Sequence, residues 1–333
     1  MREPFLESFP VPAMDGVLPQ AELDRLTLEV IRDILATYQP GHDRVVTPQN
    51  VYQPAVTAGR DALETFQLKL LLPGSRIEGL DHLDDCLAQL QAGKSVLFMA
   101  EHRGNLDAPS FNALLRREHP RYHAIIERLI YIAGRKLNES SDFIKMFTEK
   151  YARLVLVPRR DWPKPAPHET PAEAAAREAY EREAARINRA AFREMLRLKK
   201  AGFIFVLFPL GGRLKPDADN IPVRDTASYL HAFDTAYLIS MEGNTLPPKP
   251  RMEDERPLQT RVVFRVGPAL DTKTFLAEER AHFEADVRAG VVPADADFEQ
   301  HVAEHIMRRL ANLRLTGGYA DPAPPGGRPV ARA

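Results

Sequence analysis

A histidine and an aspartate lie five positions apart in the segment EHRGNLDAPSF, residues 101–111. The segment directly follows an apolar run at 95–100 that is typical of a buried strand, and it leads into a predicted helix through 112–116. A turn can bring the Asp107 carboxylate onto an imidazole nitrogen of His102, and a histidine oriented by an acid is a general base. Ligand sites in open α/β sheets gather outside the carboxyl ends of strands, so the position of the pair also favours a functional role.

The same two residues have a purely structural interpretation. Asp107 could cap the helix that follows it, and a histidine after a strand can be an ordinary surface residue. His168 and Glu173 repeat the five-residue spacing inside a proline-rich stretch. The spacing therefore needs support from the rest of the chain.

A second segment, FIFVLFPLGGRLKP at 203–216, is another apolar strand that runs straight into glycines and basic residues. Gly211 and Gly212 permit backbone N–H groups to approach an anion, and Arg213 and Lys215 supply positive charge. The segment predicts a cradle for a phosphate group. The alternative is a plain glycine turn with exposed basic side chains.

Two further strand ends carry positive charge within residues 131–160. One predicted strand ends at Arg135, and another ends just before Arg159 and Arg160. If these side chains face one cleft, a phosphorylated alcohol could be held there while His102 reaches its hydroxyl. Taken singly, each arginine is also typical of a solvated surface group.

Together these segments resemble the glycerolipid acyltransferase family, and within it the soluble, plastid-type glycerol-3-phosphate acyltransferases. The family's first block, a His and an Asp separated by four residues after a strand, matches His102 and Asp107. The third block, a Pro-x-Gly-Gly-Arg-x-Arg-Pro-like turn, is closely similar to PLGGRLKP at 209–216, and the second resembles AGRKL at 133–137 more loosely. The similarity runs from about residue 20 to 270, and the order of the blocks is more specific than any one of them.

The resemblance implies a role for each candidate residue. His102 would remove the proton from the sn-1 hydroxyl of glycerol 3-phosphate as that oxygen attacks an acyl thioester, and Asp107 would orient the imidazole. The product is lysophosphatidate, the acyl donor is an acyl carrier protein or coenzyme A thioester, and no metal or other cofactor is expected. The residues expected to bind phosphate are Arg135, Arg159, Arg160, Arg213 and Lys215, and the glycines whose N–H groups could hold the oxyanion are Gly104, Gly211 and Gly212.

Departures from the family pattern leave the substrate open. Leu210 stands where membrane-bound relatives carry an acid and soluble ones a small polar residue, and the segment after Pro222 is shortened. A lysophosphatidate acyltransferase would share His102 and Asp107. A non-catalytic phosphate- or lipid-binding protein would use the basic turn alone. A phosphate-ester hydrolase is disfavoured, because the sequence offers neither a metal cluster nor an obvious nucleophile.

The elements that must position these residues are those of an α/β fold. Amphipathic spacing predicts helices over 21–38, 60–72 and 80–91, and a capping-box sequence at Thr170 opens a long helix that runs to Lys200. Short apolar or β-branched runs predict strands at 95–100, 129–133, 154–157, 203–208, 236–241 and 261–266. This alternation predicts an α/β domain with a buried sheet, although these short runs do not show whether the strands are parallel or mixed. We expect a mixed, largely parallel sheet flanked by helices.

We divide the chain into a helical N-terminal domain over 1–78, an α/β acyltransferase domain over 79–316, and a Pro/Gly-rich tail over 317–333 that is typical of disorder. The single cysteine, Cys86, excludes an intrachain disulfide. The N-terminus lacks the apolar core of a secretory signal, and the longest apolar run, 203–210, is far shorter than the roughly 20 residues of a spanning helix. We therefore expect a cytoplasmic protein, and peripheral contact with a membrane stays open.

The charge composition bears on the partners. The 333 residues include 45 Lys plus Arg and 46 Asp plus Glu, which gives a formal net charge of −1. This balance does not favour a nucleic-acid partner. The expected partners are glycerol 3-phosphate and an acyl carrier protein or coenzyme A thioester.

Overall fold

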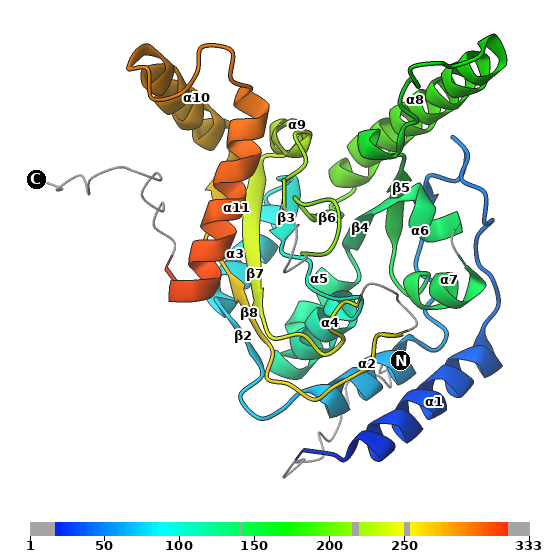
Figure 1. The fold of residues 1–333 in the computed structure, drawn as a ribbon. Helices are drawn as coiled ribbons and strands as arrows, with labels where there is room; N and C mark the ends of the chain where they lie inside the picture. Colours follow the sequence, from blue (N-terminus) through cyan, green and yellow to red (C-terminus); the bar gives the residue numbers. More distant parts are fainter. Residues whose placement is uncertain (1–16, 140, 215–219, 250–253, 319–333) are drawn as a thin grey trace, which may run out of the picture.

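A mixed sheet forms the centre of the computed structural model, which describes residues 17–139, 141–214, 220–249 and 254–318. Within these ranges the sheet has nine strands in the order β1-β5-β4-β6-β3-β7-β8-β2, with β9 beside β7 (Figure 1). The strands are β1 (Tyr52–Gln53), β2 (Arg76–Glu78), β3 (Val96–Ala100), β4 (Leu129–Gly134), β5 (Arg153–Leu156), β6 (Ile204–Leu207), β7 (Thr235–Glu242), β8 (Val263–Val266) and β9 (Leu270–Asp271).

The five strands β5, β4, β6, β3 and β7 are parallel neighbours, and β2 pairs with β8 in the same sense. The pairs β1–β5, β7–β8 and β7–β9 are antiparallel. The prediction of a mixed, largely parallel sheet is therefore confirmed. Because parallel strands end at the same edge, the loops that follow β4, β5, β6, β3 and β7 meet there.

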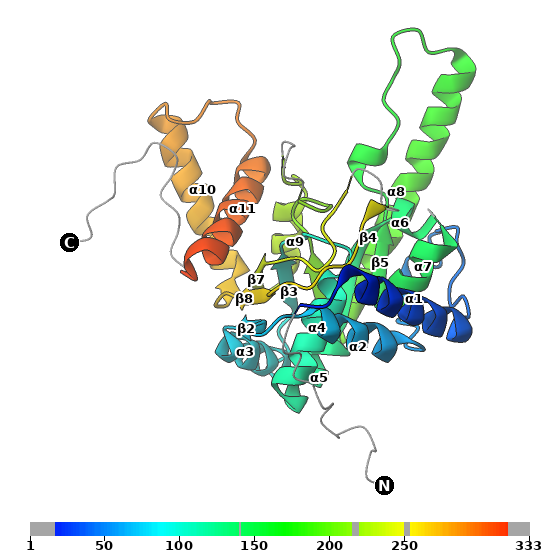
Figure 2. The same cartoon turned by 60° about the horizontal axis from the view of Figure 1, so that its bottom comes forward.

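Helices cover both faces of the sheet (Figures 1 and 2). They are α1 (Gln20–Thr37), α2 (Arg60–Leu70), α3 (Leu80–Gln91), α4 (Asp107–Glu118), α5 (His123–Ile126), α6 (Arg135–Glu139), α7 (Asp142–Thr148), α8 (Pro171–Lys200), α9 (Thr226–Ala232), α10 (Thr272–Arg288) and α11 (Phe298–Thr316). The sequence of β3, VLFMA, shows the reason. Leu97 and Met99 pack with α8, α9 and α11, whereas Val96 and Phe98 pack with α3, α4 and α5. A strand buried on both faces has to be continuously apolar.

The long helix α8 begins at the predicted capping box. The Glu173 N–H donates to Thr170 Oγ1 at 3.3 Å, and the Thr170 N–H donates to Glu173 Oε2 at 2.8 Å. These two bonds satisfy backbone donors that the first helical turn leaves free. Figure 1 shows that the outer part of α8 projects away from the sheet.

The N-terminal part of the chain does more than form helices. Helices α1 and α2 share an apolar cluster that includes Leu26, Ile34 and Leu63. The same part of the chain also supplies β1 and β2 to the sheet. The domain division at residue 78 stays a prediction.

Two further sequence predictions concern the C-terminal tail and the membrane. Helix α11 ends at Thr316 with Gly317 in the left-handed region, at φ 65°, and the tail beyond residue 318 lies outside the described residues. In the described part of the chain, no helix combines the length and apolar composition needed to cross a membrane.

Candidate active site

The loop that joins β3 to α4 brings His102 and Asp107 together. Asp107 Oδ2 lies 2.9 Å from His102 Nδ1 and also accepts the backbone N–H groups of Arg103 at 2.6 Å and Gly104 at 3.0 Å. Asp107 is the first residue of α4 and is 5% exposed. One buried carboxylate oxygen thus fixes both the turn and the imidazole.

The imidazole is held in one orientation. A neutral histidine that donates Nδ1–H to a carboxylate carries its lone pair on Nε2. The ring of Phe208 stacks on the His102 ring with centroids 4.3 Å apart and an interplanar angle of 19°. The His102 side chain is 21% exposed, and no described residue makes a hydrogen bond with Nε2. Nε2 is therefore the imidazole nitrogen that stays available to accept a hydrogen bond.

Neighbouring segments tie down the backbone of this loop. The Leu214 N–H donates to the His102 carbonyl at 2.7 Å, and Asn244 Nδ2 donates to the Arg103 carbonyl at 2.7 Å. A Cβ atom at Gly104 would lie 2.3 Å from Asn244 Oδ1, so the close approach of Asn244 requires glycine there. The Gly104 N–H is donated to Asp107 and is engaged in this structure.

Glu101, the residue before His102, links the loop to the C-terminal helix. Its carboxylate accepts the Met241 N–H at 3.0 Å and forms an ion pair with Arg314 of α11. Burial raises the pKa of Glu101 above its usual range, while the Met241 N–H and the Arg314 guanidinium act in the opposite direction. The register of this loop thus depends on α11 as well as on β3.

The predicted phosphate cradle after β6 is a tight turn. The Gly211 N–H donates to the Phe208 carbonyl at 2.7 Å, and Gly211 has φ +61°. The Arg160 guanidinium lies across this turn and donates to the carbonyls of Leu210, at 3.2 Å, and Gly211. The N–H of Gly212 has no hydrogen-bond partner among the described residues. Of the three glycines proposed for the oxyanion, Gly212 is the one whose N–H stays available here.

Arg213 is paired with an acid that the sequence did not predict as part of the site. Its guanidinium forms an ion pair with Glu255, and Asn105 Nδ2 donates to the other oxygen of the same carboxylate at 2.9 Å. The Glu255 side chain is 2% exposed. Three chain segments, after β3, β6 and β7, therefore meet at one ion pair beside the His102 loop.

The remaining basic candidates lie in different surroundings. The exposed Arg159 guanidinium lies 4.3 Å from the centroid of the Trp162 ring. The Arg135 guanidinium lies 4.8 Å from the centroid of the Tyr180 ring, on α8. Lys215 lies outside the described residues. The structure thus brings Arg160 and Arg213 to the loop after β6 and directs Arg135 to α8.

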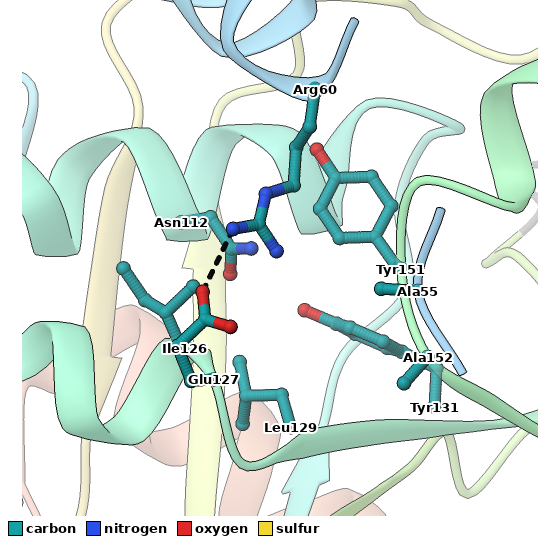
Figure 3. A pocket seen from close by; sticks show the side chains of 9 residues that line it. All are labelled: Ala55, Arg60, Asn112, Ile126, Glu127, Leu129, Tyr131, Tyr151 and Ala152. Carbon is teal, nitrogen blue, oxygen red and sulfur yellow. Dashed lines mark hydrogen bonds and ion pairs between the residues drawn. The ribbon is translucent and has the colours of Figure 1, made fainter. Parts of the chain in front are cut away.

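A polar pocket of about 280 Å³, counting its open mouth, lies between α2, α4 and the first residues of β4 (Figure 3). Arg60 in this pocket is already paired with Glu127, at 2.8 Å. Burial raises the pKa of the Tyr131 and Tyr151 hydroxyls. The Tyr131 ring also stacks on Phe208, with centroids 6.3 Å apart. The pocket is connected to His102 through aromatic rings, but its guanidinium is not free for a phosphate.

Sequence reasoning missed Phe208, Asn244 and Glu255. Phe208 had a signal, because an aromatic residue at the end of a strand beside the glycine turn is placed to contact that edge. Asn244 had a weaker signal in its position two residues after the strand that ends at Glu242. Glu255 had none, because it lies well beyond the end of β7 at Glu242 and in a charged stretch.

Comparisons with known proteins give little further guidance. No protein-family model and no curated protein matches the chain. Among solved structures, the chain is similar to the 1-acyl-sn-glycerophosphate (LPA) acyltransferase PlsC from Thermotoga maritima. The two are 14% identical with a TM-score of 0.39, over 77% of this chain and 82% of that one. A similarity of this size does not describe the chemistry of the site.

Proposed function

We propose that this chain is an acyltransferase that moves a fatty acyl group from a thioester carrier to the sn-1 hydroxyl of glycerol 3-phosphate. The observation that carries the proposal is the 2.9 Å contact between His102 Nδ1 and Asp107, which leaves Nε2 as the basic nitrogen at the carboxyl edge of the sheet. The resemblance of the sequence blocks supplies the reaction class, and the lysophosphatidate product follows from it.

In the proposed reaction, His102 Nε2 takes the proton of the acceptor hydroxyl as its oxygen attacks the thioester carbonyl carbon. The resulting tetrahedral intermediate collapses, the carbon–sulfur bond breaks, and the imidazolium returns the proton to the departing sulfur. Asp107 stabilises the imidazolium between these steps. The Gly212 N–H is the best candidate for holding the oxyanion.

The phosphate of the acceptor is assigned to the basic residues at the same edge. Arg213 has the planar fork that suits two phosphate oxygens. Arg160 adds positive charge while it supports the turn. Lys215, Arg159 and Arg135 remain weaker members of this assignment.

The test is the release of thiol from an acyl-coenzyme A or acyl carrier protein thioester, measured with different acceptors. The proposal predicts release with glycerol 3-phosphate well above the rate without acceptor. Thiol release that requires lysophosphatidate instead would indicate a lysophosphatidate acyltransferase. Equal release with and without any acceptor would contradict acyl transfer to an alcohol.

A further inference from the structure

The Glu255 carboxylate is held by three donors beside the loop that carries His102. One of its oxygens pairs with Arg213 Nη1, and the other accepts from Asn105 Nδ2 at 2.9 Å. The Lys249 N–H lies 3.5 Å from the first oxygen. A guanidinium, an amide and a backbone N–H around one carboxylate form an oxyanion site that an internal acid fills.

This site is adjacent to the candidate base. Asn105 lies in the loop between His102 and Asp107, and Leu214, next to Arg213, donates its N–H to the His102 carbonyl at 2.7 Å. A displacement of the Glu255 carboxylate would therefore remove a hydrogen bond from the loop that carries His102.

The charges of Glu255 and Arg213 determine the electrostatic environment of a phosphate that approaches this site. The Glu255 side chain is 2% exposed and the Arg213 side chain 22% exposed, so the pair is largely screened from water. Arg213 is neutralised within the folded chain. A phosphate that approaches Arg213 first meets the negative charge of Glu255, and it gains the full guanidinium only when that carboxylate gives way.

From this arrangement we infer that Glu255 is a specificity-determining residue that competes with the acceptor's phosphate for Arg213 and Asn105. The inference rests on the proposed function and deepens it. Acceptors that carry a phosphate monoester displace the carboxylate, whereas a neutral alcohol such as glycerol leaves it in place. Glu255 thus lowers the affinity for phosphorylated acceptors, which have to displace its carboxylate before they bind Arg213.

The experiment measures equilibrium binding of glycerol 3-phosphate to the whole chain by isothermal titration calorimetry. Glu255→Gln keeps the shape of the side chain and removes its charge. We expect it to lower the Kd by about tenfold or more, the size of one hydrogen bond to a charged group. The gain should vanish in the double variant Glu255→Gln/Arg213→Gln. Glu169→Gln is the matched control, because Glu169 also pairs with an arginine, Arg177, but lies two residues before α8 begins, and it should leave the Kd unchanged.

An unchanged or higher Kd for Glu255→Gln would overturn the inference, as would a gain that survives the loss of Arg213. If the Gln variant does not fold, Glu255→Asp retains the charge on a shorter side chain, and it should lower the Kd by a smaller factor. An unchanged or higher Kd for this variant would equally overturn the inference. Thiol release is followed in parallel. If the wild-type chain transfers an acyl group to no acceptor, the proposed function is wrong, whereas the Kd comparison still tests the competition between Glu255 and phosphate.

Discussion

The side chain of Asp107 contributes both to the orientation of His102 and to the structure of the turn before α4. Its Oδ2 atom joins the His102 imidazole to two backbone N–H groups, so it acts on the base and on the turn at once. An asparagine can still accept hydrogen bonds at this position, but it carries no negative charge to stabilise an imidazolium.

Asp107→Asn is expected to lower turnover by about 10² to 10⁴-fold with little change in acceptor Kd, the range that a general base contributes. The measurement is single-turnover thiol release together with the melting temperature. A large drop in melting temperature with unchanged turnover per folded molecule would show that Asp107 only caps α4.

Arg213 has two roles that its substitutions can separate. Arg213→Ala removes the phosphate fork and also leaves the Glu255 carboxylate buried without its cation, which costs about 3–5 kcal/mol for a buried pair. Arg213→Lys keeps the charge and loses only the fork. We expect the Lys variant to keep most of the stability and still bind glycerol 3-phosphate about tenfold more weakly.

The comparison for Arg213 uses glycerol 3-phosphate against glycerol as acceptors. Equal losses on both acceptors would mean that Arg213 supports the loop and does not bind the phosphate.

At the scale of elements, α11 reaches the site from the C-terminal end of the described chain. Arg314 pairs with Glu101, and Arg265 of β8 donates to the Arg314 carbonyl at 3.1 Å. Glu101 in turn precedes His102. The pair therefore couples the packing of α11 against β7 to the orientation of the base.

Arg314→Gln leaves the buried Glu101 without its cation and should lower the free energy of unfolding by about 1–3 kcal/mol at neutral pH. The folded-state pKa of Glu101 is already raised, so the native state binds more protons than the unfolded state in the pH range between 4.5 and that raised pKa. Stability from this group is thus fully present below pH 4.5 and falls as pH rises through the raised pKa. The deficit of the variant should shrink as pH falls.

Chemical denaturation at a series of pH values measures the loss in the free energy of unfolding of Arg314→Gln. The control is Arg288→Gln, because Arg288 is exposed. A deficit that is independent of pH would show that Arg314 acts through packing and not through the charge of Glu101.

The elements also show what the sequence could predict. The parallel strands β3, β4, β6 and β7 were predicted because each contains a short run of mainly apolar residues, and β3 and β6 are buried throughout. Strands β1, β2 and β9 have two or three residues, too few to carry a periodicity, and only their partners in the sheet define them. The pair of His102 and Asp107 could be proposed from spacing because one short turn joins them. The ion pair of Arg213 with Glu255 could not, because a separation of 42 positions leaves no local pattern.

At the scale of the whole molecule, distant parts of the chain converge on one edge of the sheet. The loop after β3 supplies the base, the turn after β6 supplies Arg213, and the segments after β7 supply Asn244 and Glu255. Helices on both faces fix the strands whose ends present these groups. The proposed reaction requires this convergence, with the imidazole of His102 as its base.

Single-turnover thiol release with glycerol 3-phosphate, compared between the wild-type chain and His102→Ala, tests the role of His102 most directly. His102 is partly exposed in a loop, so the variant should fold with an unchanged melting temperature. We expect the rate to fall by about 10² to 10⁴-fold, the contribution of a general base. A folded variant that keeps more than about half of the wild-type rate, with chemistry limiting, would contradict the role given to His102.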